Sequence, residues 1–198
     1  MYVWIPVVSS LLAVLVAAAA AWTDLRTGRI PNKLTLAAFA VGLLLQVTAG
    51  HFHIARTGFG GNTALGGLAM GLVGALVASA PFLALFYKNV AHRDGSRENV
   101  GGGGDVKLMA GLGALVGYYR GIELLFFALC AAAIFAGARL AWHGRLLAAL
   151  SNSLFISINP VLPRKWRREI TADLLHKMRI GGAILAGTLV SVVLSQPL

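Results

Sequence analysis

Long runs of apolar residues, separated by short polar segments, dominate this chain of 198 residues. A run of about 17 to 25 apolar residues is long enough to cross the hydrocarbon core of a bilayer as a helix. The pattern predicts six membrane-spanning helices, at residues 3–22, 34–50, 63–87, 106–119, 121–142 and 180–197. The predicted fold class is therefore all-α, a polytopic integral membrane protein whose single domain occupies residues 1–198.

The fourth predicted span is unusually short. Residues 106–119 number 14, and as a helix they reach only about 21 Å against a hydrocarbon thickness of roughly 30 Å. We therefore expect either that the preceding glycine run, 101–104, dips into the membrane or that the bilayer is thinned there. Irregular backbone at membrane depth is stable only where it is buried in protein or lines a wet cavity. The shortness thus indicates a polar pocket around Asp105.

The longest polar segment, from His143 to Met178, is more than a linker. Apolar residues recur in it at every fourth position, and lysines and arginines occupy many positions between them: Trp166, Ile170, Leu174 and Met178 are the apolar set. This pattern is typical of a helix that lies in the plane of an anionic membrane surface. We predict an interfacial amphipathic helix there, in contact with the anionic inner leaflet.

Composition and charge fix the class and the orientation. A chain that is 58% hydrophobic with a mean hydropathy of +0.77 has more apolar surface than a soluble core of this size could bury. If the first span runs from outside to inside, 15 of the 17 lysines and arginines lie on the inner side, as the positive-inside rule requires. The net charge of +10 is then a topology signal. Nucleic-acid binding would not predict this alternation by loop, so no nucleic-acid partner is expected.

The first span, the single cysteine and a pair of histidines have structural rather than catalytic interpretations. The small residues Ala17 to Ala21 resemble a signal-peptide cleavage site, but no basic segment precedes them, so we interpret the first span as a retained helix with its N-terminus outside. Cys130 is the only cysteine, which excludes a disulfide within the chain and a multi-cysteine metal site. His51 and His53 lack a third ligand, so no metal is expected.

Two of the seven acidic residues, Asp24 and Asp105, lie at the edges of hydrophobic runs. A carboxylate is costly there, and such residues usually mark function. Two complete spans separate them, so both must return to the same membrane face. Two neighbouring carboxylates share one proton, and such a pair can cleave a peptide when one activates water and the other polarises the carbonyl. Lys107 is expected to face the lipid headgroups rather than the same pocket.

Each aspartate also has a simpler explanation. Asp105 could be a first-turn acid that the helix dipole favours, and Asp24 could balance Arg26 at the interface. A non-enzymatic membrane scaffold, or an ion or proton transporter that uses both acids, is a second class of function. Transport predicts acids near the bilayer midplane, whereas these lie at one face. A serine protease would need a histidine partner for Ser79, and no predicted span contains a histidine.

Two motifs resemble those of a known family. Asp24, followed by Arg-Ile-Pro-Asn at 29–32, and the Gly-Gly-Gly-Asp-Val-Lys-Leu segment at 102–108 resemble the type IV prepilin peptidases, which are Gly-x-Gly-Asp membrane aspartic proteases. The motif order and the six-span layout agree, so the resemblance covers nearly the whole chain. It implies that Asp24 and Asp105 are the catalytic pair and that no cofactor is needed. The motif residues expected to border substrate access are Ile30, Pro31, Asn32, Gly102, Gly104 and Lys107.

The resemblance also implies the substrate. Prepilins and pseudopilins carry a short basic leader that is cut just after a glycine, ahead of a hydrophobic helix, at the cytoplasmic face of the bacterial inner membrane. Many longer relatives also methylate the new N-terminus and carry a cysteine-rich zinc-binding insertion. This chain looks like the short form of tight-adherence pilus systems, without N-methyltransferase activity. A presenilin-like or archaeal preflagellin peptidase is a related alternative.

One segment departs from the family pattern. Short members often carry Arg-Ile-Pro-x-Gly-Pro at the entry to the last span, whereas this chain has Arg-Ile-Gly-Gly-Ala at 179–183. The departure concerns substrate preference more than the chemistry.

Overall fold

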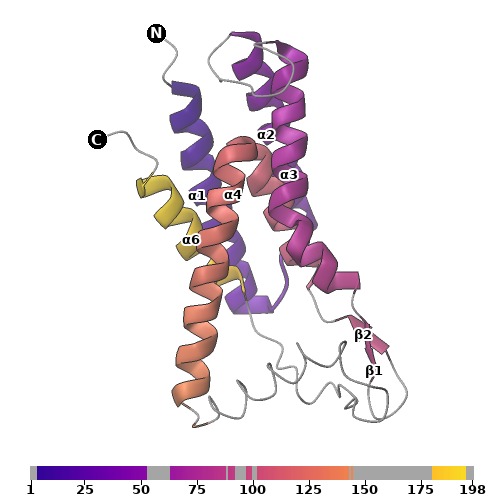
Figure 1. Ribbon diagram of the computed structural model, residues 1–198, viewed down its shortest axis with the longest axis vertical. Coiled ribbons are helices and arrows are strands. Elements are labelled where there is room, and N and C mark those ends of the chain that lie inside the picture. Colours follow the sequence, from indigo (N-terminus) through magenta and orange to yellow (C-terminus); the bar gives the residue numbers. More distant parts are fainter. Residues whose placement is uncertain are drawn as a thin grey trace, which may run out of the picture.

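Five helices form a bundle in the described part of this computed structural model (Figure 1). The structure describes residues 4–52, 63–87, 89–91, 97–99, 102–142, 144 and 180–194. The helices are α1 (Trp4–Thr27), α2 (Asn32–His51), α3 (Ala64–Tyr87), α4 (Gly103–Trp142) and α6 (Gly181–Leu194). Two short strands that the sequence did not predict, β1 (Asn89–Ala91) and β2 (Arg97–Asn99), pair antiparallel with Val90 opposite Glu98.

Four of these helices, α1 to α4, are long and apolar enough to cross a membrane, and α6 is a shorter apolar helix of 14 residues. This confirms the predicted class of helical integral membrane protein. The predicted count of six spans differs from the five helices described, and the difference lies in α4, which has 40 residues.

Helix α4 is bent back on itself at Gly117. The backbone there has φ 78° and ψ −177°, a conformation that residues with a Cβ rarely adopt. A Cβ added to Gly121 would lie 3.8 Å from the Cα of Gly113, although eight residues of straight helix would span about 12 Å. The expected spans 106–119 and 121–142 are therefore two arms that lie side by side, joined by the bend (Figure 1).

A side chain from α2 supports the bend. The amide nitrogen Nε2 of Gln46 donates a hydrogen bond to the carbonyl oxygen of Leu115 at 3.0 Å. Interrupting a helix leaves backbone groups without their intrahelical partners, and within a membrane those groups must be satisfied by protein. Gln46 supplies one such partner, so α2 and the bend stabilise each other.

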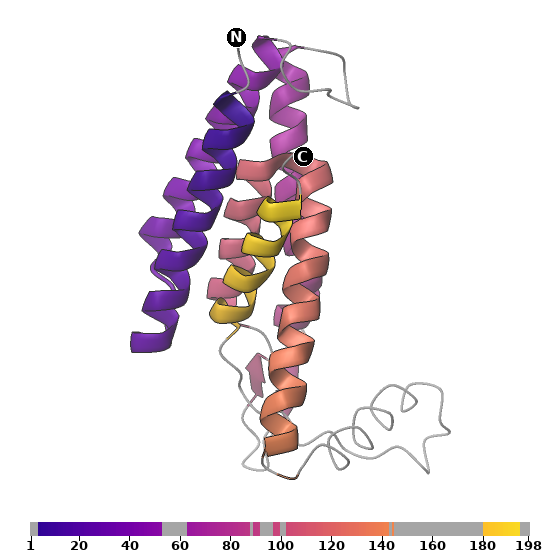
Figure 2. The same cartoon turned by 90° about the vertical axis from the view of Figure 1, so that its left-hand side faces the viewer.

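Small residues bring the helix backbones together around α4. The backbones of Gly74 in α3 and Gly113 in α4 approach so closely that neither position has space for a Cβ. Gly42 of α2 packs in the same way against the first arm, and Gly187 of α6 packs against Ala128 of the second arm. In lipid, helices associate largely through such van der Waals packing. Helix α4 therefore forms the centre against which α2, α3 and α6 pack (Figure 2).

The amphipathic helix predicted around residues 166–178 lies outside the described residues. It stays a prediction.

The glycine contacts lead to a matched test within α4. Replacing glycine by alanine inside a helix normally favours the helix by about 1 kcal/mol. At Gly113 the new methyl group would overlap the backbone of Gly74, whereas at Gly137 it would meet nothing within 4 Å. Gly113→Ala should therefore lower the unfolding temperature in detergent by roughly 5 °C, and Gly137→Ala should not lower it. Equal shifts for both variants would contradict the close α3–α4 contact.

Candidate active site

Asp24 extends the buried face of α1. Ala13, Ala17 and Ala20 are fully buried, and their spacing of three or four residues places Asp24 on the same side of the helix. Its side chain is only 7% exposed. The helix ends just beyond it, where the N–H of Gly28, at φ 66°, donates to the carbonyl oxygen of Asp24 at 2.9 Å. A buried carboxylate therefore lies in the last turn of α1.

The carboxylate of Asp24 accepts a hydrogen bond from a distant segment. The backbone N–H of Gly181, the first residue of α6, donates to Oδ2 of Asp24 at 3.1 Å. The simpler explanation for Asp24, a charge balance with Arg26, gains no support from the described contacts. The guanidinium of Arg26 lies over the ring of Trp22, 4.2 Å from its centroid, and forms no ion pair with Asp24.

Asp105 lies in the first turn of α4, as the first-turn explanation expected, and it also faces the bundle. It is on the helix face of Leu108 and Leu112, which are completely buried. Asp105 itself is partly buried, and it is near enough to Asp24 for the two charges to repel. The structure therefore brings together the two carboxylates. From the sequence, only the even number of spans between them placed both on one membrane face.

The two sequence motifs that carry these aspartates touch each other. The Nζ of Lys107 donates a hydrogen bond to Oδ1 of Asn32 at 2.9 Å, and a Cβ on Gly104 would lie 3.2 Å from the Cβ of Ile30. Pro31 lies between them in an extended conformation at the start of α2. Lys107 is exposed, as expected, but its partner is a motif residue. The motifs thus form one contiguous unit.

The glycines ahead of Asp105 also border the site. A Cβ on Gly102 would lie 2.7 Å from Oδ2 of Asp105, and one on Gly103 would lie 3.3 Å from Cε2 of Phe86. Side chains at these positions would crowd the carboxylate or the end of α3. Gly101, the remaining member of the run, lies outside the described residues.

Helix ends therefore build the site. The C-terminal end of α1 and the N-terminal ends of α2, α4 and α6 meet at one end of the bundle (Figures 1 and 2). Gly181 lies in the segment that departs from the family pattern, and its contact with Asp24 was not predicted from the sequence. The signal available was the glycine pair 181–182 at the start of an apolar run.

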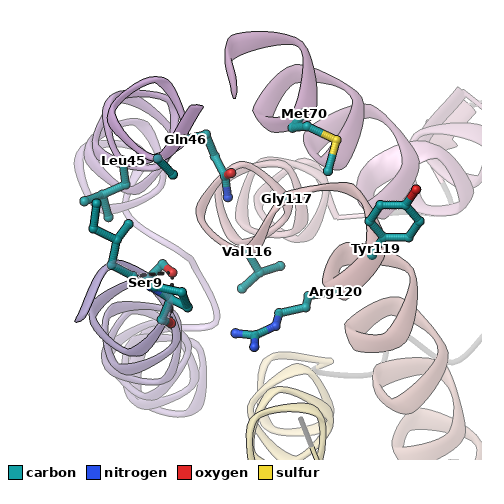
Figure 3. Close-up of a pocket in the computed structure, with 11 residues that line it drawn as sticks. Ser9, Leu45, Gln46, Met70, Val116, Gly117, Tyr119 and Arg120 are labelled. Carbon is teal, nitrogen blue, oxygen red and sulfur yellow. Dashed lines mark hydrogen bonds between the residues drawn. The ribbon is translucent and has the colours of Figure 1, made fainter. Parts of the chain in front are cut away.

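A cavity at the opposite end of the bundle is separate from the carboxylates. It has a volume of about 280 Å³ and lies beside the bend of α4 and the first turns of α1. Figure 3 shows the side chain of Arg120 extending into it toward α1, where the guanidinium donates to Oγ of Ser10 at 3.0 Å. Pro6 lines this cavity, and 18 residues of helix, about 27 Å, separate Pro6 from Asp24. The cavity is therefore remote from the carboxylate pair.

Comparison with known proteins identifies the family. The sequence model of the type IV leader peptidase family matches residues 11–137, which is more than half of the chain and includes both aspartates. The chain belongs to this family, and the predicted relationship is confirmed. It is therefore a protease of the prepilin-leader type. No curated protein and no solved structure is significantly similar to the chain.

The contact between the motifs leads to a test of the glycine run. Valine at Gly104 would press against Ile30 beside Asp105, whereas residue 101 precedes the motif. Gly104→Val should therefore impair cleavage of a prepilin-like peptide at least tenfold more than Gly101→Val, measured at matched protein levels. Equal and mild effects would indicate that the run is only a connection with no part in substrate access.

Proposed function

We propose that this protein is an aspartic endopeptidase that uses Asp24 and Asp105 to cut the short leader of prepilins or pseudopilins after a glycine. The observation that carries the proposal is the meeting of the two carboxylates at one end of the bundle, within a single unit built from both motifs. Membership of the leader peptidase family supports the same reaction class.

The pair can perform peptide hydrolysis without a cofactor. Because the two charges repel, one carboxylate holds a proton while the other stays ionised. The ionised member removes a proton from water as the water attacks the scissile carbonyl carbon, and the protonated member donates a hydrogen bond to the carbonyl oxygen. The tetrahedral intermediate then collapses, the C–N bond breaks, and the leaving amine receives the proton that the first carboxylate took from water.

The placement of the site suits a leader peptide. The carboxylates lie at the ends of helices rather than halfway along them, so the cleaved bond would lie near a membrane face. The adjoining glycines 102–104 leave space for an extended substrate backbone to approach. With the charge asymmetry of the sequence interpreted by the positive-inside rule, this end faces the cytoplasm, where a basic leader remains.

The same placement disfavours the second class of function. A transporter that moves ions or protons through paired acids would hold them near the bilayer midplane, at broken helices. The broken helix here is at Gly117, and the aspartates lie one full arm of α4 away from it.

We further propose the short form of the enzyme, without N-methyltransferase activity, acting in pilus assembly or secretion. One cysteine in the whole chain cannot form the cysteine-rich zinc-binding insertion of the longer relatives.

The aspartate pair gives the principal test. Asp24→Asn and Asp105→Asn should each reduce cleavage of a prepilin-like peptide at least 1,000-fold, because the reaction needs both an ionised and a protonated carboxyl group. Glu123→Gln serves as the control, because it neutralises an exposed carboxylate beyond the bend of α4 at Gly117 and should retain activity. Product sequencing should place the cut after a glycine. Substantial cleavage by either folded aspartate variant would overturn the assignment, and so would loss of activity in EDTA that a metal restores.

The orientation of the protein in the membrane has its own test. In a Cys130→Ser background, single cysteines at Ser96 and Ser153 should be shielded from an impermeant thiol reagent added to intact cells, whereas one at Thr57 should react. Permeabilised cells provide the control, since all three cysteines should then be labelled. Labelling of residue 96 from outside would invert the topology and separate the carboxylates from a cytoplasmic leader.

A further inference from the structure

The two carboxylates have different surroundings, and the difference bears on their roles. Asp24 lies in the last turn of α1, where the partial negative charge of the helix end disfavours an anion. It is also almost completely buried. Asp105 lies in the first turn of α4, where the helix end favours an anion. Helix position alone would therefore make Asp105 the ionised member.

The hydrogen bond from α6 reverses that preference. Oδ2 of Asp24 accepts the N–H of Gly181 at 3.1 Å, at the partially positive start of α6, which offsets the end of α1. In the described part of the chain, no donor bonds to the carboxyl group of Asp105. The free energy by which a hydrogen bond stabilises a charged group is roughly two to three times the free energy that the first turn of a helix contributes. The direct bond therefore outweighs the helix position of Asp105.

We propose that the backbone N–H of Gly181 is a positioning group that keeps Asp24 ionised, so that Asp24 activates the water and Asp105 holds the proton. This assignment of roles rests on the proposed peptidase function and deepens it. In the reaction, Asp24 takes the water proton as the oxygen bonds to the carbonyl carbon. The carbonyl π electrons move to its oxygen, which Asp105 stabilises by donating a hydrogen bond.

The other described charged groups at this end do not replace Gly181. Arg26 lies over Trp22, and Lys107 bonds to Asn32. Arg29 and Lys33 also lie at this end, and neither hydrogen-bonds to Asp24. The described parts of α3 and α6 contain no charged residue. Apart from Asp105 itself, Gly181 is therefore the described group that acts most directly on the carboxylate of Asp24.

Residue 181 must be a glycine because of its contact with Asp24. A Cβ on Gly181 would lie 2.8 Å from Oδ2 and 3.0 Å from Cβ of Asp24, so the carboxylate or the start of α6 would have to move. The adjacent Gly182 would place a Cβ within 4 Å of nothing. Gly181 and Gly182 thus form a matched pair, of which one contacts the carboxylate and the other does not.

The first experiment compares Gly181→Ala with Gly182→Ala in purified, lipid-reconstituted full-length protein. Displacing the donor makes the anion of Asp24 harder to form, so the acid limb of the pH profile of kcat/KM should move up by about one pH unit. On that acid limb the kcat of Gly181→Ala should fall about tenfold with KM within twofold, whereas Gly182→Ala should match the wild type in both. Equal profiles for the two variants would overturn the proposal.

A second variant removes the donor without adding any atoms, in case Gly181→Ala disturbs folding. Replacing Gly181 by glycolic acid during cell-free translation converts its N–H into an ester oxygen, and the same exchange at residue 182 is the control. The 181 ester should reproduce the upward shift of the acid limb, and the 182 ester should not. An unshifted profile with the 181 ester would overturn the role of Gly181 even if both aspartates proved essential. Activity in Asp24→Asn would instead overturn the peptidase assignment itself.

Discussion

Close backbone contact around α4 is the constraint on which the site depends. Lipid provides no hydrophobic force to drive helices together, so their association rests on packing that small residues permit. Gly74 meets Gly113, and Gly187 meets Ala128, with too little space for larger residues. These contacts fix α3 and α6 against the two arms of α4. Because the arms are joined at Gly117, holding them in place also fixes the distant helix ends where the aspartates lie.

Much of the site could be predicted from the sequence because it depends on local rules. The apolar runs predicted the helices, and an even number of crossings placed Asp24 and Asp105 on one face. Such inferences need only helix periodicity and the thickness of a bilayer. The structure adds that Asp24 shares the buried side of α1 with Ala13, Ala17 and Ala20.

The remaining features depend on contacts between distant segments. Nothing in the hydrophobic pattern shows that Gly117, rather than a separate loop, reverses α4, because the positive φ of one glycine leaves no trace in hydropathy. Gly181 is 157 positions from Asp24, outside the region that matches the family. Its role depends on a backbone N–H, which every residue except proline carries. Only the packed structure shows that this particular donor reaches the carboxylate.

Building the site from helix ends has an electrostatic consequence. The end of α1 is unfavourable for the anion of Asp24, and the starts of α4 and α6 are favourable for negative charge. The start of α6 reaches Asp24 by a direct hydrogen bond, whereas no described donor bonds to Asp105 at the start of α4. Among the described residues, two chemically identical side chains thereby acquire different surroundings with no lysine or arginine bonded to them. The asymmetry that acid–base catalysis needs can therefore arise from backbone geometry alone, which suits a membrane site where each added charged side chain would be costly.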